Sequence, residues 1–196
     1  RSTSDFHRQG SEAVQNDGMR VLAGICEDER YPPLAVQSHA AAIVRDGMAE
    51  HINRSERVAY EGIKCLGHFA TSLIEDHRDV MVIEEGNAIG ITVQSMRVHL
   101  SSRRLQREGC NTLLQLGIES PENAMLLADQ GYGTVVANAL RAHPNSMALA
   151  YGAAECIIGL SECVVEAANQ KWEDIDIDGY EEDNAEEEEG KACGRG

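Results

Sequence analysis

Apolar positions recur along the chain with helical spacing in four separate stretches. Within each stretch they are four, four and three residues apart, which places all four side chains on one face of a helix. From one stretch to the next the pattern is offset by 44, 47 and 44 residues. The four sets are Val14, Gly18, Leu22 and Ile25; Val58, Gly62, Leu66 and Phe69; Leu105, Gly109, Leu113 and Leu116; and Leu149, Ala153, Ile157 and Leu160. The pattern predicts a long helix that repeats four times.

Shorter helices are predicted ahead of three of these long helices. One ends at a histidine each time, over 48–51, 96–99 and 140–143. Another is predicted earlier still, over 80–85 before Gly86 and over 123–130 before Gly131, because glycine suits a sharp bend between helices. Residues 30–37 are the corresponding segment ahead of the first short helix, shortened by Pro32 and Pro33. Each unit therefore has up to three helices, which bury their apolar faces only when units stack.

The second position of each set is small: Gly18, Gly62, Gly109 and Ala153. Glycine inside a helix costs about 1 kcal/mol relative to alanine. Its recurrence at the same place predicts that a neighbouring helix approaches closely there.

Composition agrees with an all-α fold. Apolar residues make up 42% of the chain and aromatic residues only 4%, which suits closely packed helices built from small aliphatic side chains. The six cysteines show no CxxC spacing, and we interpret them as reduced thiols, most of them buried. That interpretation places the protein in the cytoplasm or nucleus. No run of 18 apolar residues predicts a membrane span, and the N-terminus carries no signal-peptide pattern.

Negative charge is concentrated at the C-terminal end. The formal net charge is −16, yet eleven of the 33 acidic residues lie between Glu173 and Glu189, and only two of the 17 basic residues follow Trp172. We therefore divide the chain into an N-terminal arm (1–10), a repeat array (11–168) and an acidic, disordered tail (169–196). The charge argues against general nucleic-acid binding, because phosphate neutralisation needs clustered Lys and Arg.

Residues 84–99 and 105–143 resemble armadillo repeats, and the resemblance extends over roughly 11–165. It implies a right-handed α-solenoid of three-helix repeats, with an incomplete first repeat and three further ones. HEAT repeats are the alternative, but they have two helices per unit, and the separate short helices before Gly86 and Gly131 favour armadillo. The resemblance implies a non-catalytic scaffold or adaptor that binds another protein.

Armadillo proteins that hold extended peptides carry an Asn one residue before the last apolar position of the long helix. This chain has Gly24, His68, Gln115 and Gly159 there, so that mode of peptide binding is not expected. A groove along the long helices remains a candidate protein-binding surface. Its candidate residues are Arg20, Lys64, His68, Asn111 and Gln115.

Arginines gather in the loops that precede two of the long helices, where Arg57 and Arg104 occupy the same register position. The edge residues are Arg54, Arg57, Arg103, Arg104 and Arg107. One interpretation is a solvated edge. The other is a docking strip for an acidic partner, which includes the chain's own tail, because Arg suits bidentate contacts with carboxylates.

Two patterns raise the question of metal binding. His51, His99 and His143 end equivalent helices of different layers, too far apart for zinc, and are better explained as residues at helix C-termini. Asp174, Asp176 and Asp178 begin a calcium-loop pattern whose twelfth position is Ala185 instead of Glu. A calcium-responsive adaptor is therefore an alternative function.

No catalytic motif or cofactor-binding loop occurs, so we expect no enzymatic activity and no cofactor; an unrecognised enzyme is the lesser alternative. The chain begins at Arg1, and we expect it to be a piece of a longer array. Its first long helix would then present an uncapped edge, through which a lone fragment could self-associate.

Overall fold

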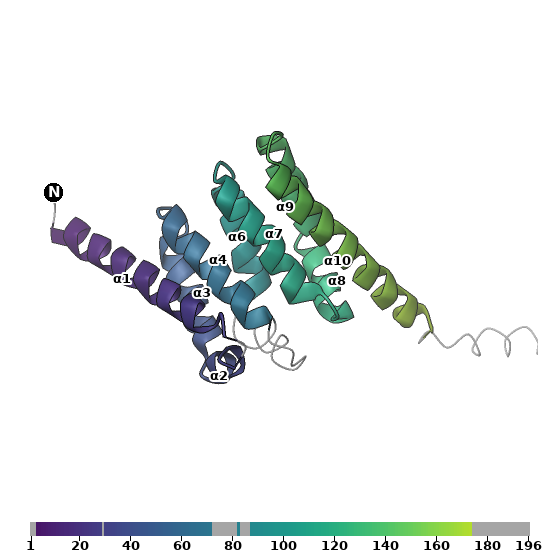
Figure 1. The fold of residues 1–196 in the computed structure, drawn as a ribbon, viewed down its shortest axis with the longest axis horizontal. Helices are drawn as coiled ribbons and strands as arrows, with labels where there is room; N and C mark the ends of the chain where they lie inside the picture. Colours follow the sequence, from purple (N-terminus) through teal and green to yellow (C-terminus); the bar gives the residue numbers. More distant parts are fainter. Residues whose placement is uncertain (1–2, 29, 72–81, 83–86, 174–196) are drawn as a thin grey trace, which may run out of the picture.

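The computed structural model describes residues 3–28, 30–71, 82 and 87–173 (Figure 1). Within these residues every regular element is a helix, so the fold is all-α. The helices are α1 (Thr3–Ile25), α2 (Pro32–Gln37), α3 (Ala40–His51), α4 (Glu56–Ala70), α6 (Ala88–Val98), α7 (Arg103–Gly117), α8 (Pro121–Asp129), α9 (Tyr132–Ala142) and α10 (Met147–Glu173).

The bends between short and long helices follow local residue chemistry. The residues ahead of α3, α6 and α9 are His39, Asn87 and Gly131, each with a positive φ of 58°, 47° and 74°. Gly131 is the glycine that the sequence placed at such a bend, since it adopts this conformation without strain. Ahead of α6 the left-handed residue is Asn87, whose side chain caps the helix by accepting a hydrogen bond from the Gly90 amide at 3.0 Å.

The helices form successive layers along the long axis of the molecule (Figure 1). The long helices lie side by side: α4 packs between α1 and α7, and α7 packs between α4 and α10. Within a layer, α3 packs on α4, α6 packs on α7, and α8 and α9 pack on α10. The period of 44 to 47 residues therefore corresponds to the repeat from one layer to the next.

The core lies where the sequence placed it in the two central layers. All eight positions of the second and third sets, from Val58 to Phe69 and from Leu105 to Leu116, are buried. Helices approach closely at the glycines: a side chain at Gly109 would lie 2.5 Å from Met96 Sδ, and one at Gly62 would overlap Met48. The predicted packing role of these two glycines is confirmed.

The outer layers differ from the prediction. On α1, Val14 is 71% exposed, Ile25 is 46% exposed and Gly18 faces open space, because no described helix covers this side as α3 covers α4. Within the described residues this side of α1 is therefore uncovered. The buried residues of α1 are instead Asn16, Met19, Ala23 and Cys26.

On α10 one buried position differs by one residue from the position predicted from the sequence. Ile157 is 40% exposed, and Cys156, one residue earlier, takes the buried place that the sequence had assigned to Ile157. Ile157 lies on the side of α10 that no described layer covers, so its apolar character does not bring burial.

The helix boundaries also differ from those expected. Helix α1 begins at Thr3, so most of the segment 1–10 is helical rather than a separate arm. Helix α10 continues to Glu173, five residues past the expected end of the array. The helix predicted over 80–85 falls outside the described residues apart from Val82, which is buried.

One described helix is long and apolar enough to cross a membrane by length and composition alone. It covers Met147–Asn169 within α10, with a mean hydropathy of 1.5. In the structure one side of this helix packs against α7, α8 and α9, and Leu149, Ala153 and Leu160 are buried there. Only 28% of this apolar window is buried, so it is not a fully buried core helix, and one such helix does not by itself indicate a membrane protein.

Candidate functional site

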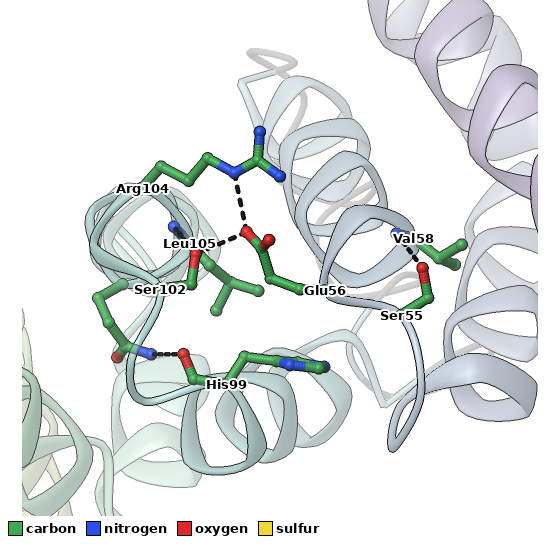
Figure 2. A network of polar contacts seen from close by, with 8 residues as sticks. Ser55, Glu56, Val58, His99, Ser102, Arg104 and Leu105 are labelled. Carbon is green, nitrogen blue, oxygen red and sulfur yellow. Dashed lines mark hydrogen bonds and ion pairs between the residues drawn. The ribbon is translucent and has the colours of Figure 1, made fainter.

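Polar contacts join the N-terminal ends of α4 and α7 to the long helix of the preceding layer. Ser55 caps α4 by accepting a hydrogen bond from the Val58 amide at 3.3 Å, and its hydroxyl donates to Glu12 Oε1 of α1 at 2.6 Å. Ser102 repeats the arrangement one layer on, capping α7 and donating to Glu56 Oε1 of α4 at 2.6 Å (Figure 2). At both junctions a glutamate of one layer therefore occupies the space beside the capped helix of the next.

The second junction carries an additional cation. Arg104 Nε donates to Glu56 Oε1 at 2.8 Å, and its guanidinium lies over the Tyr60 ring, 4.7 Å from the centroid. Figure 2 shows Arg104 and Ser102 converging on the Glu56 carboxylate from α7 and the turn before it. The hydrogen bond from Arg104, with a smaller contribution from Ser102, lowers the pKa of Glu56 below its usual 4.5.

The third junction breaks this pattern. Ser146 caps α10 as Ser102 caps α7, accepting a hydrogen bond from the Leu149 amide at 3.3 Å. The position equivalent to Glu12 and Glu56, 47 residues after Glu56, is Arg103. A cavity of about 360 Å³ opens there between α7 and α10. Its lining residues are Arg103, Arg104, Arg107, Asn145, Ser146, Met147 and Ala148.

The cavity is strongly positive. Three guanidinium groups line it from the first turns of α7, and the N-terminal end of α10 lies on its other side, with the partial positive charge of a helix start. None of the lining residues is acidic. Among the residues that the structure describes, no ion pair joins Arg103 or Arg107 to a carboxylate, whereas Arg104 is held by Glu56.

The geometry of the third junction suits the binding of an anion. In the second junction a carboxylate accepts hydrogen bonds from a Ser hydroxyl and from an arginine, at 2.6 and 2.8 Å. The third junction offers the same kinds of donor without a carboxylate from the described part of the chain. A carboxylate supplied from elsewhere would find charge-assisted donors there, and these are the stronger class of hydrogen bond.

The structure brings together part of the predicted arginine edge. Arg103, Arg104 and Arg107 share the cavity, while Arg54 and Arg57 are exposed near the start of α4 and are not among its lining residues. Arg57 and Arg104 do hold equivalent register positions, as expected from the 47-residue offset.

The groove residues lie in register on neighbouring long helices, but their charges are largely engaged. Arg20 forms an ion pair with Asp17 at 3.3 Å, and Lys64 forms one with Glu27 at 3.3 Å. Burial, followed by the positive charge of Lys64, lowers the pKa of His68, so its ring is neutral at pH 7. Asn111 is exposed and Gln115 is half-buried. This surface offers less free charge than the edge.

The recurrent histidines tie one layer to the next. His99 Nε2 donates to the Ile52 carbonyl at 2.7 Å, and His143 Nε2 donates to the Leu100 carbonyl at 2.8 Å. Each histidine lies at the C-terminal end of its own helix and hydrogen-bonds to the turn that follows the equivalent helix of the preceding layer. His51 occupies the first such position, and its buried Nε2 has no hydrogen-bond partner among the described residues.

In the described ranges no three His, Cys, Asp or Glu side chains come together as a metal site would require. Asp174, Asp176 and Asp178 of the calcium-loop pattern lie outside the described residues. Cys26, Cys65, Cys110 and Cys156 are buried free thiols, and burial raises the pKa of Cys110 to about 12.

Comparison of the chain with protein-family models, with curated proteins and with solved structures found no match.

The arginines of the cavity were predicted from the sequence, whereas the serines and glutamates that explain the cavity were not. A usable signal was present: a serine follows an acidic residue by 43 residues at Glu12 and Ser55 and by 46 at Glu56 and Ser102. Ser146 follows Arg103 by the same interval as the first pair. The substitution of arginine for glutamate becomes informative only once the serines are known to be helix caps.

Proposed function

We propose that this chain is a short right-handed solenoid of armadillo-type repeats that works as a non-catalytic scaffold, binding an acidic segment of a partner protein in the arginine-lined cavity between α7 and α10. The repeat of layers at 44 to 47 residues supports the solenoid, and the three helices α8, α9 and α10 of the last layer support armadillo over HEAT repeats. The buried free thiols suit a reducing compartment such as the cytoplasm or nucleus.

The observation that carries the proposal is the contrast between junctions. Two of them hold an internal glutamate against the capping serine, and the third holds Arg103 and a cavity in the same place. Arg103 occupies the position that holds a glutamate at the other two junctions, and Arg107 lies one turn later. The third junction therefore has two positive charges where the others have a negative one. A partner carboxylate restores the arrangement found at Glu56.

A run of acidic side chains is the partner chemistry that fits best. Arg103 and Arg107 are exposed on the rim, so they can form bidentate contacts without the cost of burying an unpaired charge. The net charge of −16 opposes every polyanion at long range, so a short acidic segment that contacts only the cavity fits better than an extended nucleic acid. The groove on the long helices is the second candidate surface, and its ion-paired Arg20 and Lys64 make it the weaker one.

The chain's own acidic tail is a natural competitor for this cavity. Helix α10 has 27 residues, so its two ends lie about 40 Å apart. The thirteen residues from 174 to 186 span up to about 45 Å when extended. The glutamates at 186–189 can therefore reach the N-terminal end of α10 only when the intervening segment is nearly fully extended, so they would compete at a modest effective concentration.

Binding of a fluorescent tetraglutamate peptide, followed by anisotropy with tetraglutamine as the control peptide, tests the proposal. We expect tetraglutamate to bind and the Arg103→Glu/Arg107→Glu variant to lose at least tenfold in affinity. The matched control is Arg54→Glu/Arg57→Glu, which makes the same charge change at the junction that Glu12 already fills. Equal losses in both variants would contradict the cavity as the site, because a general charge effect would then explain the binding.

Competition by the acidic tail for the cavity is tested in the same peptide-binding assay. Changing the glutamates at 186–189 to glutamine should tighten peptide binding if the tail competes in cis. Unchanged affinity would exclude the competition and leave the peptide site itself standing.

A further inference from the structure

The buried imidazole of His51 has an unpaired nitrogen, whereas its counterparts in the next two layers are paired. His51 is 4% exposed, and its Nε2 has no hydrogen-bond partner among the described residues. The Nε2 atoms of His99 and His143 each bond to the carbonyl of the residue that follows the histidine of the preceding layer. A buried polar atom without a partner is unfavourable, so an acceptor is expected in front of His51. By the same rule, that acceptor is the carbonyl after a histidine of the first layer.

The chain has a histidine at that place in the first layer. His7 precedes His51 by 44 residues, which is the offset that relates the apolar positions of α1 to those of α4. Residues 7–14 are HRQGSEAV and residues 51–58 are HINRSERV, so the histidine, the serine, the glutamate and the valine coincide. In the second layer these residues form the end of α3, the turn, the cap of α4 and its first turn. The sequence of a whole junction is therefore repeated at 7–14.

In the structure this first junction is helical, because α1 runs without a break from Thr3 to Ile25. A carbonyl inside a helix bonds to the amide four residues further on, so the carbonyl of Arg8 is engaged within α1 and is not offered to His51. The helix also carries Gly10 in its interior, where glycine is unfavourable relative to alanine. The helical state therefore contains a costly glycine and leaves a buried nitrogen unpaired.

We propose that residues 3–10 are a strap with two states. The helix of this structure is the open state, and a turn at residues 7–10 is the closed state. On closing, α1 begins at Glu12 and the hydroxyl of Ser11 caps it, as Ser55 caps α4. The first layer then has the same kind of junction as the second.

Closure supplies what the open state lacks. In the turn, the carbonyl of Arg8 is released from the helix and accepts a hydrogen bond from Nε2 of His51, as the corresponding carbonyls do at the next two layers. The chain before the turn runs back along α1, as α3 runs back along α4. Val14 is 71% exposed in the open state, while its equivalent Val58 is fully buried in the layer that contains α3. The closed strap therefore covers the exposed Val14.

The rest of α1 stays in place while the strap moves. Ser55 donates to Glu12 Oε1 at 2.6 Å, and Met19, Ala23 and Cys26 are buried further along the helix, which packs on α4. All of these contacts of α1 lie beyond residue 11, so the change is confined to its N-terminal end. The strap and the arginine-lined cavity lie toward opposite ends of the stack, and the two proposals are independent (Figure 1).

Replacement of Ser11 by alanine distinguishes the two states by the sign of its effect. In the closed state Ser11→Ala removes a helix cap and should lower the melting temperature of the full chain by about 2–4 °C. In an uninterrupted helix the same change improves helix propensity, so the melting temperature would stay equal or rise. Ser146→Ala, which removes the cap of α10, shows the effect of a lost cap. Ser161→Ala, at an exposed position inside α10, is the matched control and should cause no such loss.

Nuclear magnetic resonance of the full chain tests the turn and the histidine directly. We expect non-helical Cα shifts at residues 7–10 and helical shifts from Glu12 onward. We also expect the Nε2 proton of His51 to resonate downfield in the range of those of His99 and His143, whose hydrogen bonds provide the reference. Helical Cα shifts throughout α1, or an unchanged or raised melting temperature for Ser11→Ala, would overturn the proposal.

Discussion

At the scale of single residues, the structure shows how one position sets the character of a junction. Glu56 receives hydrogen bonds from Ser102 and Arg104, and the equivalent Arg103 leaves a positive cavity instead. Because the pKa of Glu56 is lowered in the folded state, its ionised form stabilises the fold. That contribution is complete above about pH 4.5 and is lost as the pH falls through the lowered pKa.

Replacing Glu56 with glutamine should therefore destabilise the protein in a pH-dependent way. At pH 7 we expect a loss of about 0.2–1 kcal/mol in the free energy of unfolding, since Arg104 and Glu56 are both partly exposed to solvent. The loss should shrink below pH 4.5, where the native carboxylate becomes protonated. Urea unfolding at several pH values measures this, with Arg104→Gln as the control that removes the cause of the shift. A constant difference down to pH 2 would contradict the ion-pair account.

At the scale of helices, closeness of approach depends on what lies opposite each glycine. Gly62 and Gly109 lie against Met48 and Met96 of the preceding short helix, whereas Gly18 of α1 meets nothing within 4 Å. The three glycines share one register position in the sequence. The structure therefore separates a packing glycine from an unpacked one, a distinction that the repeat pattern does not contain.

Leucine at Gly62 and at Gly18 should have very different effects. Gly62→Leu forces α3 and α4 apart, and overpacking of about 1–3 kcal/mol should lower the melting temperature by about 3–10 °C. Gly18→Leu meets no neighbour and improves helix propensity, so its melting temperature should stay equal or rise slightly. Thermal unfolding followed by circular dichroism compares the two. Equal destabilisation would show that the register assigned to these helices is wrong.

The sequence predicted the helical class, the long helices and their period because apolar spacing records which face of a helix is buried. It could not predict the exposure of Val14 and Ile157, because burial depends on whether another layer covers the face. The arginines of the cavity were predicted but the cavity itself was not, for a similar reason. Arg103 and Arg107 are visible in the sequence, but the cavity exists because Ser146 lies across from them on another helix.

At the scale of the whole molecule, stability should be graded along the stack. The helices α4 and α7 are each held between two long neighbours, while α1 and α10 each have one outer side uncovered by the described layers. In stacked repeats each layer is stabilised chiefly by its nearest neighbours. The two ends therefore open more readily than the centre.

Native-state hydrogen exchange measures this gradient directly. We expect the amides of α4 and α7 to exchange slowest, with free energies of opening near that of global unfolding, and those of α1 to exchange fastest among the long helices. Equal protection of all four long helices would contradict the account in which each layer is stabilised by its nearest neighbours.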